Sequence, residues 1–265
     1  MLIDTHAHIN FPDFESDLDQ VINNSIKNGV EKIICVSANL SHSIKAIEIA
    51  KKYPGIVYAA IGIHPQQTDP ENKDSLPKQI EKLKELVANN QIIAIGECGL
   101  DFSEAPKPEK NRSPENQVFL FKKQIEIAQE FHLPLIVHSR KSLAQTLEIL
   151  NPLKNKITGV IHCYSGGKSD IHKIEEIGFY FGLDGNLTYD IGLQNVAKLI
   201  PLEKIVLETD CPFLTPQPYR GLRNKPKNVK IIAEFLAEIK GISLQEQEIS
   251  QKTTKNAQDL FKIKK

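Results

Sequence analysis

The chain has 265 residues, 40% of them hydrophobic and 25% charged, which is the composition of an ordinary globular protein with enough chain to bury a core. Its formal net charge of +0 gives no global sign of a nucleic-acid or membrane partner, so any anion-binding surface must be local. The longest apolar runs are too short to span a membrane, and the first ten residues lack the basic region and cleavage-like site of a signal peptide.

Short apolar segments alternate along the chain with helical patterns. The segments are rich in Ile and Val and nearly continuous in apolar character, which is typical of strands buried on both faces. We expect strands near residues 2–6, 31–36, 56–61, 92–97, 133–138, 157–162, 178–183 and 203–208. We expect helices over residues 17–27, 41–52, 76–89, 115–132, 141–150, 171–177, 194–200 and 228–240. This alternation, without a break in composition, predicts a (β/α)8 TIM-like barrel in a single domain over residues 1–265.

An open, doubly wound α/β sheet is the alternative fold. No Gly-x-Gly-x-x-Gly motif follows the first predicted strand, which weakens that alternative. Residues 104–114 form a charged, Pro-rich loop that is about as long as compact domains usually allow, and we expect this loop to be mobile.

The four cysteines, Cys35, Cys98, Cys163 and Cys211, are widely scattered. This is not the dense spacing of a secreted disulfide framework, and it favours a reducing cytoplasm. Cys98 and Cys163 each follow a candidate metal ligand described below. Because neighbours in a strand point to opposite faces, we expect both of these cysteines to fill the core.

The first predicted strand carries two histidines near its end, His6 and His8. Residues i and i+2 of a strand share a face, so both imidazoles point to one place. Two converging neutral imidazoles make half of a transition-metal site. The alternative is a pair of partly exposed histidines at a loose N-terminus. The residues in the rest of the chain decide between a metal site and this alternative.

Most of the other predicted strands also end in, or are followed by, a side chain that a packed core would not select. In a (β/α)8 barrel the carboxyl ends of all strands meet at one face, where active sites lie, so these side chains are expected to converge. A lone histidine at a strand end is more often a structural residue, whereas several convergent ligand types indicate a metal site. The predicted ligands are His6, His8, Glu97, His138, His162 and Asp210.

Four imidazoles and two carboxylates are too many ligands for one tetrahedral ion, and they predict two divalent ions. Glu97 is the predicted bridge, because each of its two oxygens can bind one metal. The assignment gives His6, His8, Glu97 and Asp210 to one ion, and Glu97, His138 and His162 to the other. Ligation by nitrogen and oxygen without thiolate fits Zn, Mn, Co or Ni, with Mg possible at lower affinity.

The residues around these positions form a series of motifs that runs almost from end to end of the chain. The motifs are His6-x-His8, Gly62-x-His64-Pro65, Gly96-Glu97-x-Gly99-Leu100-Asp101, His138-Ser139-Arg140, His162-Cys163-Tyr164-Ser165-Gly166, Glu208-Thr209-Asp210-x-Pro212, Arg220-Gly221-x-Arg223-Asn224 and Asn256-Ala257-x-x-Leu260-Phe261. Their order and spacing resemble the TatD family of metal-dependent deoxyribonucleases. The resemblance implies a TIM-like barrel of the amidohydrolase type, a two-metal site on the residues named above, and hydrolysis of DNA phosphodiesters.

Three positions depart from the pattern of that family. Gln66 stands where the family often has a second histidine, Lys141 where an acidic residue is common, and Phe102 where tyrosine is usual. None of the three is a predicted ligand. The departures therefore affect the expected substrate preference and not the expected chemistry.

Some of the predicted site residues act beyond metal binding. Glu97 and Asp210 are the predicted catalytic residues, and the resemblance implies that Asp210 orients or deprotonates the attacking water; a helix cap or salt-bridge partner is the alternative. His64 is expected to donate to a substrate phosphate, unless it is a loop histidine packed beside Pro65. Arg140 is expected to bind a phosphate through paired hydrogen bonds, unless it is an ordinary surface arginine.

The loop over residues 215–226 follows the last predicted strand, where barrels of this kind often bind phosphate. Arg220 and Arg223 lie in it and are predicted to contact the substrate, although a structural role for Arg223 is an equal alternative. Tyr219 is a candidate for stacking on a base. Asp101 and Tyr164 complete the predicted substrate-contacting set.

The leading functional hypothesis is a cytoplasmic, metal-dependent deoxyribonuclease, a 3'-5' exonuclease on single-stranded DNA or strand ends, without a membrane partner and monomeric or weakly oligomeric. A small-molecule amidohydrolase or esterase on the same scaffold is the first alternative. That class often bridges its metals with a carboxylated lysine, and no lysine ends a predicted strand here. The second alternative is a catalytically silent nucleic-acid-binding module, which would not need the full ligand set.

Overall fold

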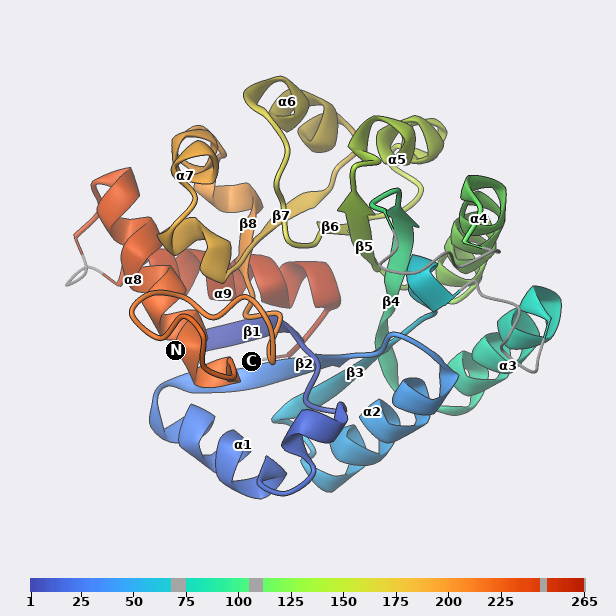
Figure 1. The fold of residues 1–265 in the computed structure, drawn as a ribbon, viewed down its shortest axis with the longest axis horizontal. Coiled ribbons are helices and arrows are strands. Elements are labelled where there is room, and N and C mark those ends of the chain that lie inside the picture. The colour runs from blue at the N-terminus through green and yellow to red at the C-terminus, as the bar shows by residue number, and fades with distance from the viewer. Residues whose placement is uncertain (68–74, 105–111, 244–246, 265) are drawn as a thin grey trace.

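The structure is a computed structural model, and it describes residues 1–67, 75–104, 112–243 and 247–264. It contains one parallel sheet in which the eight strands lie in sequence order, β1 to β8. The strands are β1 (Leu2–Ala7), β2 (Val30–Val36), β3 (Val57–Ile61), β4 (Ile92–Asp101), β5 (Leu135–Arg140), β6 (Gly159–Ile161), β7 (Tyr180–Leu183) and β8 (Ile205–Leu207). The sheet curls into a nearly closed barrel (Figure 1), so the predicted (β/α)8 fold is confirmed and the doubly wound alternative is wrong.

Helices connect the strands and surround the barrel (Figure 1). The α-helices of the described residues are α1 (Leu18–Lys27), α2 (Leu40–Lys52), α3 (Leu76–Asn89), α4 (Pro114–Glu130), α5 (Leu143–Leu150), α6 (Lys168–Glu176), α7 (Ile191–Ala197), α8 (Val229–Lys240) and α9 (Glu248–Phe261). None of these helices has the length and apolar character that a membrane span needs. Most of the loop predicted to be mobile, residues 105–111, lies outside the described residues.

The segment after β8 closes the barrel against β1. The backbone amide of Asp210 donates to the carbonyl of His6 at 2.8 Å, and the amide of His8 donates to the carbonyl of Cys211 at 2.8 Å. The buried carboxylate of Asp4 accepts from both the amide (2.9 Å) and the hydroxyl (2.6 Å) of Thr209. Barrel closure thus places the segment that carries Asp210 directly beside the two histidines of the first strand.

The barrel interior and the layer between barrel and helices form two separate apolar clusters, as expected for strands buried on both faces. The interior cluster combines Ile3, Ile34, Val36, Ala60, Ala94, Ile136, Val160 and Val206 with Ala257, Leu260, Phe261 and Ile263. The last four residues lie on or just after α9, a helix that the sequence analysis did not predict, and α9 lies against β1 and β8 (Figure 1). This helix therefore plugs the end of the barrel opposite the carboxyl ends of the strands.

We predict that Phe261→Ala destabilises the fold without touching the site. Phe261 is 2% exposed within the interior cluster. A buried Phe→Ala change leaves a cavity and costs about 3–5 kcal/mol of unfolding free energy. Denaturant unfolding measures the loss. Phe119→Ala, at a ring that is 40% exposed on α4, is the matched control and should change stability far less; equal losses in the two variants would contradict the plug role of α9.

Candidate metal centre

The two histidines of β1 face two carboxylates at the mouth of the barrel. His6 Nε2 and His8 Nε2 are 3.1 Å apart. Glu97 Oε2 lies 3.6 and 3.5 Å from these nitrogens, and Asp210 Oδ1 lies 3.6 and 3.3 Å from them. Tetrahedral ligation at 2.0–2.1 Å places ligand atoms about 3.3–3.4 Å apart. These separations therefore fit four ligand atoms around one small divalent ion.

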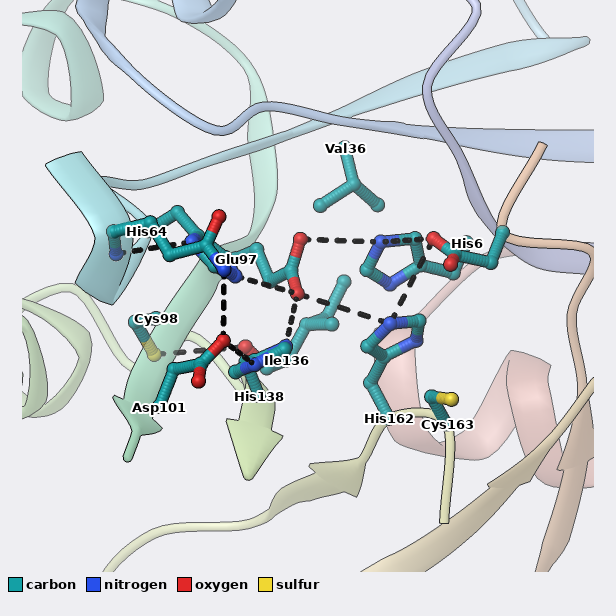
Figure 2. Close-up of polar contacts among 12 residues, drawn as sticks. His6, Val36, His64, Glu97, Cys98, Asp101, Ile136, His138, His162 and Cys163 are labelled. Atoms are coloured by element: carbon teal, nitrogen blue, oxygen red, sulfur yellow. Dashed lines mark hydrogen bonds and ion pairs between the residues drawn. The ribbon is translucent and has the colours of Figure 1, made fainter. Parts of the chain in front are cut away.

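The second oxygen of Glu97 faces a different group of imidazoles. Glu97 Oε1 lies 2.9 Å from His138 Nδ1, 3.4 Å from His64 Nε2 and 3.7 Å from His162 Nε2. Figure 2 shows Glu97 reaching between His64 and His138 on one side and His6 and His162 on the other. The carboxylate is thus placed as a bridge with one oxygen in each half of the centre.

The β4 backbone aims Glu97 into the barrel. The strand continues to Asp101, past the predicted end at Glu97, and its register with β5 shifts between Ile95 and Cys98. Such an irregularity redirects a side chain within a strand. Gly99 has a φ of 135°, and a Cβ there would lie 2.0 Å from the His138 carbonyl oxygen, so only glycine allows β4 to approach β5 this closely.

Backbone partners determine which nitrogen of His8 and His64 carries the proton. His8 Nδ1 lies 2.9 Å from the carbonyl of Val36 and must donate to it, which leaves a lone pair on the inward-facing Nε2 of the neutral ring. His64 Nδ1 instead accepts from the amide of Gln66 at 3.1 Å, so the neutral ring carries its proton on Nε2. His8 therefore presents a nitrogen with a free lone pair, as a metal ligand requires, whereas His64 presents a hydrogen-bond donor.

Three acceptor atoms meet at the first position, around His6 Nε2, which lies 3.1 Å from the nearest of them. They are His8 Nε2, Glu97 Oε2 and Asp210 Oδ1. Converging acceptors repel one another unless a cation lies between them. The arrangement of these three atoms therefore fits ligands of a divalent ion.

Outer carboxylates hold two of the other imidazoles. Asp101 Oδ2 lies 3.1 Å from His138 Nε2, and Arg112 Nη2 lies 2.7 Å from the other Asp101 oxygen in a buried ion pair. Glu208 Oε1 lies 2.8 Å from His162 Nδ1 and 2.6 Å from the amide of Cys163. Carboxylate–histidine pairs of this kind fix the ring and raise its basicity as a ligand.

Burial and neighbouring charged groups shift the pKa values of the side chains in the centre. Burial and the nearby His162 lower the pKa of His6, which favours the neutral, ligating ring. Burial opposes ionisation of Glu97, but His64, His138 and His6 hold its pKa well below the usual range. Burial likewise opposes the charged form of His162, but Glu208, Asp210 and Glu97 raise its pKa to about 10. A buried cluster of side chains with shifted pKa values is typical of a functional site.

A cavity of about 480 Å³ opens above the cluster. It is lined by His8, His64, Gln66, Glu97, His138, Ser139, Arg140, His162, Cys163, Ser165, Asn186, Asp210, Phe213 and Leu214. Arg140 ends β5 and is exposed, and no described side chain pairs with its guanidinium. The cavity thus offers one free positive charge beside the acidic and imidazole groups.

The six predicted ligands lie close to one another in the structure. His64 and Asp101 contact this cluster, and Arg140 lines the cavity above it. His64 lies closer to the ligands than expected, since the sequence analysis placed it in neither metal shell. Asp101 is not a free substrate contact: besides His138 and Arg112 it accepts from Gln66 Nε2 at 2.9 Å and from the hydroxyl of Ser103 at 2.5 Å. Its oxygens are thus occupied by protein partners, one of which is His138.

Asp101 does not line the cavity, and neither do three other predicted substrate contacts. Tyr164 is 2% exposed, packs on Phe181 and donates its hydroxyl to the carbonyl of Gly167. Arg220 places its guanidinium 3.7 Å from the centre of the Tyr189 ring. Arg223 pairs with Asp17 at 2.5 Å and also donates to the carbonyl of Asp13. For Arg223 the structure favours the structural alternative, because Asp17 already neutralises it.

The prediction that two cysteines fill the core holds for one of them. Cys98 is fully buried in the layer between barrel and helices, on the side of β4 away from the ligands, with its sulfur 3.5 Å from the carbonyl of Ile136 (Figure 2). Cys163 follows the end of β6 and lines the cavity, with its sulfur 3.7 Å from Asn186 Nδ2. The strand-alternation argument failed there because β6 ends at Ile161, two residues earlier.

The sequence analysis missed four contributors to the site. Glu208 was recognised at the end of the last predicted strand but received no role, and Arg112 was assigned to a loop. Phe213 lines the cavity. Asn224 is fully buried and donates to the carbonyls of Thr209 (2.8 Å) and Phe213 (2.7 Å), which ties down the segment after β8. The one sequence feature that pointed to these hydrogen bonds is the position of this Asn in the Arg-Gly-x-Arg-Asn motif.

A parallel eight-stranded barrel with a buried histidine and carboxylate cluster at the carboxyl ends of its strands defines a metal-dependent hydrolase. A model of the family described as TatD related DNase matches residues 3–262. The chain therefore belongs to this family, as its motifs predicted.

Individual relatives agree with the family assignment. The chain is 36% identical to the uncharacterized metal-dependent hydrolase YabD of Bacillus subtilis, covering 99% of this chain and 100% of that protein. It is 32% identical to the human deoxyribonuclease TATDN3, covering 98% and 94% of the two chains. The crystal structure of YJJV, a TatD homologue from Escherichia coli K12, superposes with a TM-score of 0.88 at 27% identity over 99% of this chain and 98% of that one.

Proposed function

We propose that this protein is a deoxyribonuclease that uses two divalent ions to hydrolyse phosphodiester bonds at the ends of single-stranded DNA, in the 3'-5' direction. The observation that carries the proposal is the position of Glu97, whose two oxygens face two separate groups of imidazoles at the floor of a polar cavity. The name of the human relative, deoxyribonuclease TATDN3, supports DNA as the substrate.

His6, His8, Glu97 and Asp210 would hold one ion, and Glu97, His138 and His162 the other. Ions bound there supply Lewis-acid activation of the attacking water and of the phosphoryl oxygen. A set of nitrogen and oxygen ligands without thiolate supports Zn, Mn, Co or Ni as the bound ions, and Mg would bind with lower affinity. Asp101 and Glu208 keep His138 and His162 oriented for this task.

Other residues act on the substrate and its protons. Burial opposes ionisation of Asp210, but His8, His162 and His6 lower its pKa, so the carboxylate is ionised at neutral pH and can orient the water and accept its proton. His64 Nε2–H donates to a phosphoryl oxygen. Arg140, with no described partner, binds a neighbouring phosphate.

We further propose that residues 1–265 act as one hydrolase domain in the cytoplasm. The β1 histidines and Asp210, which are far apart in the sequence, lie together in one half of the candidate centre, which supports a single functional unit. The four cysteines are unpaired, which supports a reducing compartment.

A small-molecule amidohydrolase or esterase on the same scaffold is the second candidate. The names of the bacterial relatives state no substrate and leave this candidate open. Against it, the bridging position holds Glu97 and no lysine of the described residues lines the cavity, whereas Arg140 supports a phosphate-bearing substrate.

The test is a metal-dependence assay on labelled oligonucleotides. We expect stepwise release of mononucleotides from single-stranded DNA, slower cleavage of blunt duplex because each opened base-pair step costs roughly 1.4 kcal/mol, and no activity in excess chelator. Up to two divalent ions per chain should be found by elemental analysis. Full activity in chelator without bound metal would overturn the metal mechanism, and nicking of closed circular DNA as fast as trimming of linear strands would overturn the end-directed reaction.

We predict that Arg140→Ala lowers kcat/KM on single-stranded DNA by about 10- to 150-fold, because a hydrogen bond to a charged group is worth roughly 1.5–3 kcal/mol. Bound metal should not change, since Arg140 contacts no predicted ligand. Salt should weaken DNA binding less steeply than in the wild type, because one fewer counterion is released. Lys123→Ala on α4, a surface cation paired with Glu126, is the control and should leave all three quantities unchanged. Loss of metal in Arg140→Ala would contradict the assignment.

A further inference from the structure

Phe213 stands out among the residues that line the cavity. It is 52% exposed, the highest exposed fraction of any Phe or Tyr residue in the described part of the chain. Exposing an apolar ring of this size to water is unfavourable unless something covers it. Its neighbours in the lining are predominantly polar or charged, so the ring is an apolar surface at the edge of a polar site.

The backbone that carries the ring is hydrogen-bonded beside the candidate metal centre. The amide of Phe213 donates to the carbonyl of Asp210 at 2.9 Å, and its carbonyl accepts from Asn224 Nδ2 at 2.7 Å. The ring centre lies 6.3 Å from that of His8 in an edge-to-face arrangement and 6.2 Å from that of Phe11. Asn224 also holds Thr209 and is fully buried, so the turn that carries the catalytic carboxylate fixes the base of this side chain as well.

We propose that Phe213 is the stacking platform for the nucleobase of the nucleotide whose phosphate is bound at the metal centre. This inference rests on the proposed function and names a subsite within it. A π-face with one side free accepts any base, which suits an enzyme that degrades strands without reading their sequence. The site then combines a phosphate-binding floor with a base-binding wall, and it selects nucleotides over sugar phosphates that lack a base.

Other exposed aromatic residues fit this role less well. Tyr219 is 45% exposed in the loop after β8 but does not line the cavity, and Phe119 lies on the surface of α4. Phe11 is stacked on His8 at 4.5 Å and packed against His42, and it does not line the cavity. Within the described residues, Phe213 is thus the exposed phenyl or phenol ring that borders the cavity.

The test compares binding of thymidine 5'-monophosphate and 2-deoxyribose 5-phosphate by calorimetry, with the metal-loaded protein. The wild type should prefer the nucleotide, and Phe213→Ala should lose about 5- to 150-fold in nucleotide affinity, the usual loss for a base stacked on an aromatic ring. Affinity for the sugar phosphate should stay the same. Phe213→Leu, which keeps the apolar volume without a π-face, should lose most of the preference, and Phe213→Trp should retain it.

Phe119→Ala is the matched control, and elemental analysis checks that every variant keeps its metal. The inference is overturned if the wild type binds the two probes equally, or if Phe213→Ala keeps the preference for the nucleotide. Because this measurement needs no turnover, it is separate from the proposed reaction. A protein that prefers the nucleotide through Phe213 but leaves oligonucleotides intact would refute the nuclease proposal and retain the base-binding subsite.

Discussion

Replacing Glu97 with Gln is expected to remove at least one of the two ions and to abolish most activity. Glu97 is the side chain with one oxygen among His6 and His8 and the other among His64, His138 and His162. The amide of Gln keeps the shape, but its NH2 group cannot ligate a cation. The loss in metal affinity should exceed the roughly 10- to 100-fold that is typical when an outer partner of a ligand is replaced.

Two comparison variants make this result specific. Asp101→Asn, which alters the outer partner of His138 and its ion pair with Arg112 but none of the predicted ligands, should fall within that 10- to 100-fold range. Glu15→Gln, at an exposed carboxylate paired with Lys45, should bind metal like the wild type. Metal titration followed by elemental analysis gives the affinities and the stoichiometry. Two tightly bound ions in Glu97→Gln would show that Glu97 is not the bridge.

Replacing Asp210 with Asn is expected to slow the chemical step while DNA binding survives. Asp210 Oδ1 lies 3.3–3.7 Å from His6, His8 and His162, and these imidazoles lower its pKa against the opposing effect of burial. The change keeps the shape but removes the charge and the proton acceptor. General-base catalysis is typically worth about 10²–10⁴-fold, and a weaker metal site adds to that loss.

Single-turnover rates at saturating protein separate this effect from binding. The affinity for single-stranded DNA should be unchanged or slightly higher, since a negative charge has left an anion-binding site. Asp259→Asn, at an exposed carboxylate paired with Lys255 on α9, is the control and should cleave normally. Cleavage by Asp210→Asn at the wild-type rate would remove Asp210 from the mechanism.

Much of the fold could be predicted because strands buried on both faces leave a local signature. The Ile- and Val-rich runs indicated the positions of the eight strands, and their alternation with helices favoured a parallel barrel. The sequence analysis did not predict α9, although its buried residues Ile249, Thr253, Ala257 and Leu260 recur at steps of three or four. Strand ends were less accurate: β4 runs four residues beyond Glu97, where its register with β5 shifts.

The candidate substrate contacts were much harder to assign from the sequence than the candidate ligands. An arginine that binds phosphate and an arginine that holds two loops together look alike in a sequence. Arg223 and its partner Asp17 are 206 residues apart, so no local pattern reveals that the charge is already paired. Arg140 has no such partner among the described residues, and Phe213 gives no sequence signal that its ring is exposed while that of Tyr164 is buried.

The sequence by itself determined the barrel, the family and the ligand types that converge, because parallel strands bring their carboxyl ends to one face whatever the details of packing. Only the tertiary structure decided what each group presents there. The carbonyl of Val36 makes His8 Nε2 a lone-pair donor, whereas the amide of Gln66 makes His64 Nε2 a proton donor. Those roles depend on single hydrogen bonds from neighbouring backbone, whose directions follow from the packed three-dimensional arrangement and from no periodicity in the chain.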